Sequence, residues 1–222
     1  MVSRVVSLDS IESPGVPALP LAPVAYEQRY QDANNNILRQ YFTILQNVFQ
    51  SLLSEDGGRF IRSPYGIFSD YTDQTAVAIN TAYVITFDTT DYTNGITLGT
   101  VAAPSTSKIT VTNAGIYSLR WSGQFESTDA ALQTALVWVK VNGTDATGTA
   151  RRISVPIGGR SVLGPEYTLS LNGGDYVELW FRVGATTISI QTQAAGGTAP
   201  NAFPSQASVK ATMSFVSALP TV

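Results

Sequence analysis

Apolar residues between Tyr26 and Leu53 recur every three or four positions, which is the spacing of one face of an α-helix. One stripe consists of Tyr26, Tyr30, Ala33, Ile37, Tyr41, Ile44, Val48 and Leu52, and a second beside it of Leu38, Phe42, Leu45, Phe49 and Leu53. Together they make an apolar face wider than one partner helix covers. Asn34, Asn35 and Asn36 are poor helix formers, at which the helix breaks or begins.

The sequence offers no second helix of this kind, so the expected neighbours are copies of the same chain. We therefore predict a trimerisation stalk over residues 26–54. Its oligomer interface would be built from Ile37, Leu38, Tyr41, Phe42, Leu45, Val48, Phe49 and Leu52. The alternative is a helix that lies across its own domain, because the strict heptad run covers only about two heptads.

From Ile67 onward the apolar period changes to two, which indicates β-strands. The alternating positions are Val77, Ile79, Tyr83, Ile85, Phe87, Ile109, Val111, Tyr117, Leu119, Trp121, Phe125, Ile153, Val155, Ile157, Tyr167, Leu169, Leu171, Val177, Leu179, Phe181, Val183, Ile188, Ile190, Val209, Ala211, Met213 and Phe215. Turn signals such as Asn94-Gly95 and Asn142-Gly143 separate about nine or ten short strands. The pattern predicts an all-β antiparallel sandwich over residues 75–222, most simply a jelly roll.

The segment before the helix is proline-rich. Its prolines recur every third residue, the period of a polyproline II helix, so their rings would share one edge. We predict an extended docking arm over residues 1–25, with contacts from Pro14, Pro17, Leu19, Pro20, Leu21 and Pro23. The alternative is a stiff linker or a disordered tail. Residues 55–74, which include Gly57-Gly58, are expected to form a hinge.

Composition narrows the function classes. Of 222 residues only 13% are charged, and the net charge is −3, with basic residues scattered along the chain. Nucleic-acid binding is therefore not expected, and sparse charge suits a protein that buries surface against partners. The chain contains no cysteine, no signal-peptide pattern and no apolar run long enough for membrane insertion.

The usual catalytic residues are missing from the sequence. Without histidine or cysteine there is no common triad, thiol nucleophile or histidine-based zinc site, and no phosphate-binding glycine motif occurs. Acidic pairs remain as the one catalytic route: Asp70 with Asp73, Asp88 with Asp91, and Glu126 with Asp129. All lie in segments that read as turns. Asp88 and Asp91 also suit a calcium ion, with a solvated loop as the simpler interpretation. We expect no enzyme activity, no cofactor and no resident metal.

Four segments resemble the C1q/TNF-like jelly rolls. These are residues 113–121 (NAGIYSLRW), 137–143 (VWVKVNG), 171–179 (LNGGDYVEL) and 215–219 (FVSAL), where Ser217 replaces the glycine of that family. The resemblance covers about residues 75–219. It implies a ten-stranded jelly roll, a compact trimer around an apolar threefold axis, and a binding head without catalysis. It also implies that Asp175 holds loop backbone. We expect Trp121, Trp138 and Trp180 in the core or at the trimer axis.

The first 60 residues, an arm followed by YEQRYQDANNNILRQYF, resemble the N-terminal part of virion proteins of short-tailed, notably marine, phages. That resemblance implies a trimeric knob or fibre fixed to the particle by its arm. The expected partners are its own copies, a capsid or tail protein, and a host glycan or receptor at the loops of the outer tip. The expected location is the virion, assembled in the host cytoplasm. The alternatives are a tail-fibre receptor-binding protein, a carboxylate-based glycan depolymerase and a cellular C1q-like ligand.

Overall fold

The computed structural model describes residues 17–21, 24–53, 63–102 and 105–219, and the chain divides into two compact units, residues 1–62 and 63–222. The first unit contains one helix, α1 (Gln28–Leu53), close to the predicted span. It runs without interruption through Asn34–Asn36, so the break that we considered there does not occur. Tyr30 Oη donates a hydrogen bond to the carbonyl of Pro20 (3.1 Å), which ties the described part of the arm to the helix.

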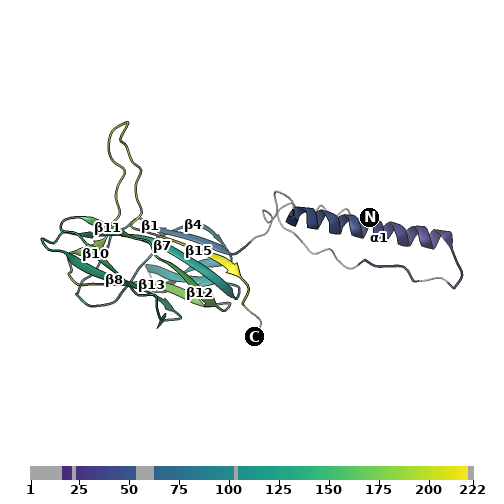
Figure 1. Ribbon diagram of the computed structural model, residues 1–222, viewed down its shortest axis with the longest axis horizontal. Coiled ribbons are helices and arrows are strands. Elements are labelled where there is room, and N and C mark those ends of the chain that lie inside the picture. Colours follow the sequence, from purple (N-terminus) through teal and green to yellow (C-terminus); the bar gives the residue numbers. More distant parts are fainter. Residues whose placement is uncertain (1–16, 22–23, 54–62, 103–104, 220–222) are drawn as a thin grey trace. The chain divides into compact units, whose positions relative to one another are not determined.

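The second unit is a sandwich of two antiparallel sheets (Figure 1). The eight-stranded sheet contains β1 (Tyr65–Asp70), β2 (Gln74–Thr75), β4 (Thr89–Asn94), β7 (Gly115–Ser127), β11 (Arg160–Leu163), β12 (Glu166–Leu171), β14 (Ile188–Ile190) and β15 (Val209–Ser217). The seven-stranded sheet contains β3 (Tyr83–Val84), β5 (Ile96–Ala102), β6 (Ser105–Val111), β8 (Gln133–Val141), β9 (Thr144–Asp145), β10 (Arg151–Val155) and β13 (Tyr176–Val183). Successive strands cross repeatedly between the sheets, which is consistent with the predicted jelly roll.

The core lies between the two sheets and follows the predicted alternation. Strand β7 alternates buried and more exposed positions along its whole length, and Tyr117, Leu119 and Phe125 are fully buried. Val137 and Val139 of β8 and Leu179 and Phe181 of β13 reach the same core from the facing sheet. The alternation of apolar and polar residues therefore predicted the buried face of the central strands correctly, because each of these strands has one face on the core.

The sandwich begins earlier than predicted. Residues 65–70 form β1, between β15 and β4 in the sheet, so the expected hinge over 55–74 is wrong from Tyr65 onward. Its buried positions include Ser69 and Asp70, and these polar residues made the segment read as a turn. Strand β4 was missed for a similar reason. It is rich in threonine, a polar residue that nevertheless favours strands.

Three positions assigned to the core are on the surface. Val77 and Ile79 are 84% and 54% exposed in the irregular segment before β3, and Ile157 is 63% exposed in the turn after β10. Alternation over two or three residues is too short a pattern to separate a strand from a loop. With several two-residue strands counted, the described residues contain fifteen strands, more than the nine or ten predicted.

Candidate binding surfaces

The predicted oligomer interface lies on a helix whose apolar side chains are open in the single chain. Phe42, Ile44 and Phe49 are 60%, 48% and 51% exposed. Ile37, Leu38, Tyr41, Leu45 and Val48 are half-buried and follow the same side of α1. Large apolar side chains in this number on one exposed helix make α1 a candidate interaction surface, and its role as an oligomer interface stays a prediction.

The predicted docking arm falls partly outside the described residues, which exclude Pro14 and Pro23. Pro17 and Pro20 are half-buried, while Leu19 and Leu21 are 50% and 95% exposed. The exposed leucines are available to a partner, so docking by this segment stays a prediction.

Each of the acidic pairs is held by structural partners. Asp70 is buried at the end of β1 and accepts hydrogen bonds from Thr72 N (2.7 Å), Thr72 Oγ1 (2.6 Å) and Thr86 Oγ1 (3.3 Å). Burial raises the pKa of Asp70, and the nearby Asp88 carboxylate acts in the same direction, while the hydrogen bonds from Thr72 and Thr86 oppose them. Asp88 accepts from Tyr71 N (3.0 Å).

The other acidic residues of these pairs are also held by hydrogen bonds or ion pairs. Asp91 lies in β4, where it accepts from Ser69 Oγ (2.6 Å) and pairs with Lys210. Asp129 accepts from Gln133 Nε2 (2.9 Å) and Thr187 Oγ1 (3.2 Å). Glu126 lies within β7 instead of in a turn, so that part of the sequence interpretation was wrong. Among the described residues, no group of three or more acidic side chains is placed to hold a metal ion.

A long hairpin between β14 and β15 stands out from the sandwich (Figure 1). Backbone hydrogen bonds join Gln193 with Gln206 and Gly196 with Phe203, which make its two sides antiparallel. The apolar pattern did not predict this hairpin, although Gly196-Gly197 within it is a turn signal.

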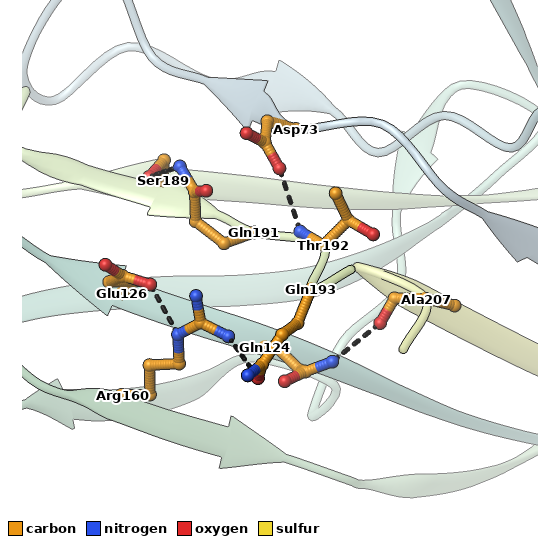
Figure 2. Close-up of polar contacts among 9 residues, drawn as sticks. All are labelled: Asp73, Gln124, Glu126, Arg160, Ser189, Gln191, Thr192, Gln193 and Ala207. Carbon is orange, nitrogen blue, oxygen red and sulfur yellow. Dashed lines mark hydrogen bonds and ion pairs between the residues drawn. The ribbon is translucent and has the colours of Figure 1, made fainter. Parts of the chain in front are cut away.

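Figure 2 shows the polar contacts at the base of the hairpin. Thr192 N donates to Asp73 Oδ1 (2.8 Å), and Gln124 Nε2 donates to the carbonyl of Ala207 (2.7 Å). Arg160 pairs with Glu126 through Nε and donates to Gln193 Oε1 (2.9 Å). Asp73 and Glu126 therefore fix a loop to the sheet, a role that spacing along the chain does not reveal.

Asp175 takes the role that the family resemblance implied. Its carboxylate accepts from Asn172 N (2.7 Å) and Asn142 Nδ2 (2.8 Å), and these bonds hold its pKa below the usual range. Asn142 also accepts from Tyr176 N (3.0 Å). It has a φ of 50° and Gly143 one of 79°, as a tight two-residue hairpin turn requires. Asp175 thus ties the β8–β9 turn to the start of β13.

The outer face of the seven-stranded sheet differs most from expectation. Trp121 is buried as predicted, but Trp138 and Trp180 are half-exposed and lie opposite each other on β8 and β13. Trp138 Nε1 donates to Asp145 Oδ1 (2.7 Å), and Lys140 Nζ lies 4.5 Å from the centre of the Trp180 ring. These two tryptophans are therefore outside the core, because strands that are apolar on both faces leave the orientation of their side chains undecided, and their predicted alternative place at a trimer axis stays a prediction.

A shallow hollow of about 500 Å³ opens beside Trp138. Its lining comes from four segments: the loop before β3, strand β8, the connection from β9 to β10, and strand β13. The lining residues are Asn80, Ala82, Leu136, Trp138, Asp145, Ala146, Thr147, Gly148, Ala150 and Arg182. An aromatic ring with a few convergent polar groups is the usual make-up of a small-ligand site.

The chain matches no protein-family model and no curated protein sequence. Among solved structures it is similar to murine APRIL, crystallised at pH 5.0, with 12% sequence identity, a TM-score of 0.44, and coverage of 70% of this chain and 100% of that one. No helix in the described part of the chain is long and apolar enough to cross a membrane.

Proposed function

We propose that this protein is a non-enzymatic, trimeric knob or fibre of a phage particle. Its arm docks on a capsid or tail protein, its helix joins three copies, and its sandwich is the displayed head. The observation that carries the proposal is the open apolar surface of α1, where Phe42 and Phe49 are more than half exposed. A helix of this kind gains stability by burying that surface against copies of itself.

The proposal is supported by the separation of the exposed apolar helix and the closed core into different units of the chain. The sandwich has its own closed core, so α1 is not needed to complete it. The acidic pairs considered for catalysis are occupied by structural hydrogen bonds and ion pairs, and nothing in their geometry favours a depolymerase. A tail-fibre receptor-binding role is the second candidate, favoured by the partly exposed Trp138 and Trp180 on the outer face of the seven-stranded sheet.

Replacing Leu45 and Phe49 together by Asp tests the stalk. We expect the variant to sediment as a monomer and the wild-type chain as a trimer, because two carboxylates per helix cannot be buried in the interface. Gln40 and Gln50 lie on the other side of α1 and are exposed, so their replacement by Asp adds equal charge as the matched control. A Leu45/Phe49 variant that still forms trimers would contradict the proposal.

The particle itself gives the second test. Virions that carry a density label on this protein should show labelled knobs, each built from three copies. Virions from which its gene is deleted should lack these knobs. If deletion of the gene left the appearance of the virions unchanged, and purified wild-type virions did not contain the protein, the assignment to the particle would be refuted.

A further inference from the structure

We infer that the outer face of the seven-stranded sheet is a binding site for an acidic saccharide, with the sugar ring on Trp138 and its carboxylate on Arg182. The inference deepens the proposed function by naming a ligand class, and it rests on that function only for the source of the saccharide, a host surface.

The register of the strands brings the required groups together. On β8, Leu136 lies between Arg152 of β10 and Arg182 of β13, and in the neighbouring row Trp138 lies beside Trp180. Residues opposite each other in an antiparallel pair have Cβ atoms about 5 Å apart. Two guanidinium groups and two indole rings therefore share one small area of the sheet.

The charges on this face favour an acidic ligand. No described residue hydrogen-bonds or ion-pairs with the side chain of Arg152 or Arg182, so both guanidinium groups keep their donors free. The carboxylate of Asp145, by contrast, is engaged by Trp138 Nε1 and by Lys140 Nζ (3.3 Å). An unpaired arginine at the wall of a hollow is suited to bind a carboxylate through two parallel hydrogen bonds.

The shape and make-up of the hollow favour a sugar. Its volume of about 500 Å³ is that of a small-ligand site, and it is shallow, as suits a ligand that is part of a longer chain. The hydrogen bond from Nε1 to Asp145 fixes the Trp138 ring, so a sugar stacked on it through its C–H face loses little side-chain entropy. Asn80 and Thr147 supply polar atoms for hydroxyl groups.

The competing occupant of an exposed aromatic face is a second copy of the chain. Unpaired cations argue against it, because copies meeting around a symmetry axis through this face would gather their Arg152 and Arg182 side chains in one interface. The face that binds copies would instead be the apolar side of α1, where Phe42, Ile44 and Phe49 are exposed.

The test uses the full chain and oligogalacturonate, a chain of uronic acids, with its methyl ester as the uncharged match. Tryptophan fluorescence and calorimetry should detect binding of the acid and much weaker binding of the ester. Arg182→Gln should weaken binding of the acid on the order of ten- to a hundredfold, as expected for losing a charged hydrogen-bond pair. Trp138→Ala should weaken acid and ester alike.

Arg120→Gln is the matched control, because Arg120 is an exposed arginine on the other sheet, paired with Glu166 (2.8 Å), and its loss should leave binding unchanged. Absence of binding at millimolar oligogalacturonate, equal affinity for acid and ester, or an Arg182→Gln variant that binds like wild type would each overturn the inference. So would a change of oligomeric state in Arg182→Gln. Sedimentation separates this result from the proposed function: a monomer that binds refutes only the trimer, and a trimer that does not bind refutes only the site.

Discussion

Single carboxylates in this sandwich act as structural links, and their surroundings shift their pKa values in opposite directions. Asp70 is buried, which raises its pKa, whereas Asp175 at the surface accepts two hydrogen bonds that lower its pKa. Because a pKa that differs between the folded and unfolded chain makes stability depend on pH, the two residues give opposite and testable signs.

For Asp70, the folded chain retains a proton that the unfolded chain loses above its ordinary pKa of 3.8. Stability should therefore fall as the pH rises from 3.8 through the raised pKa of the folded state. Asp70→Asn removes this dependence while keeping a carbonyl oxygen to accept from Thr72. Urea unfolding from pH 3.5 to 6.5 measures it: wild type should lose stability relative to the variant with rising pH, and a constant difference would contradict the prediction.

For Asp175, the carboxylate stabilises the folded chain above the ordinary pKa of 3.8, and that contribution is lost as the pH falls through the lowered pKa of the folded state. Asn at this position has one acceptor oxygen for the two donors, Asn172 N and Asn142 Nδ2. We expect Asp175→Asn to cost about 1 kcal/mol at pH 7 and much less near pH 2.5. Urea unfolding at both pH values checks this, and an equal cost at both would refute the charge-assisted link.

Among the elements, what the sequence predicts well is what periodicity encodes. The helix is long and strongly periodic, and the central strands alternate over many residues, so both were predicted closely. Strand β1 was missed because its buried positions are filled by Ser69 and Asp70, whose burial depends on partners in distant strands. The exposed Trp138 was misplaced because LVWVKV is apolar on both faces, and only strand pairing decides which face meets the core.

The hairpin between β14 and β15 is the element that contributes least to the core. Residues 197–206 are exposed throughout, and its contacts with the sandwich concentrate at its base. Replacing residues 194–205 by Asn-Gly would join Gln193 to Gln206 through a two-residue turn and keep those contacts. We expect the free energy of unfolding to change by less than about 1 kcal/mol, because a shorter loop also costs less to close.

Urea unfolding of the shortened chain measures that effect. Arg160→Ala serves as the contrast, since it removes the pairing with Glu126 and Gln193 at the base and should destabilise the fold more than the deletion does. A deletion that unfolds the sandwich would mean that the tip of the hairpin, and not its base, stabilises it.

At the scale of the whole molecule, the exposed apolar surface of α1 and the closed core of the sandwich belong to different units. The outer face of β7, β12 and β15 is polar. Its residues include Ser118, Arg120, Ser122, Thr168, Ser170, Thr212 and Ser214, with Ile116 as an apolar exception. This face does not supply the apolar threefold axis that the family resemblance implied, so that axis stays a prediction. Large exposed apolar side chains occur on both units, but those on the sandwich, such as Tyr71, Leu132 and Val162, are spread over several strands and loops, whereas Phe42, Ile44 and Phe49 lie on the single helix α1.

A chain of residues 63–222 should therefore fold and remain monomeric. Its core is complete without α1, so it should unfold in one cooperative thermal transition, as single domains do. Lacking the apolar side chains of α1, it should sediment as a monomer at concentrations where the full chain forms trimers, because polar faces of this kind gain little from association. Sedimentation equilibrium on both chains, with calorimetry of the shorter one, makes the comparison. A trimeric 63–222 chain would move the site of assembly from the helix to the sandwich, and a chain that fails to fold would show that α1 belongs to the core.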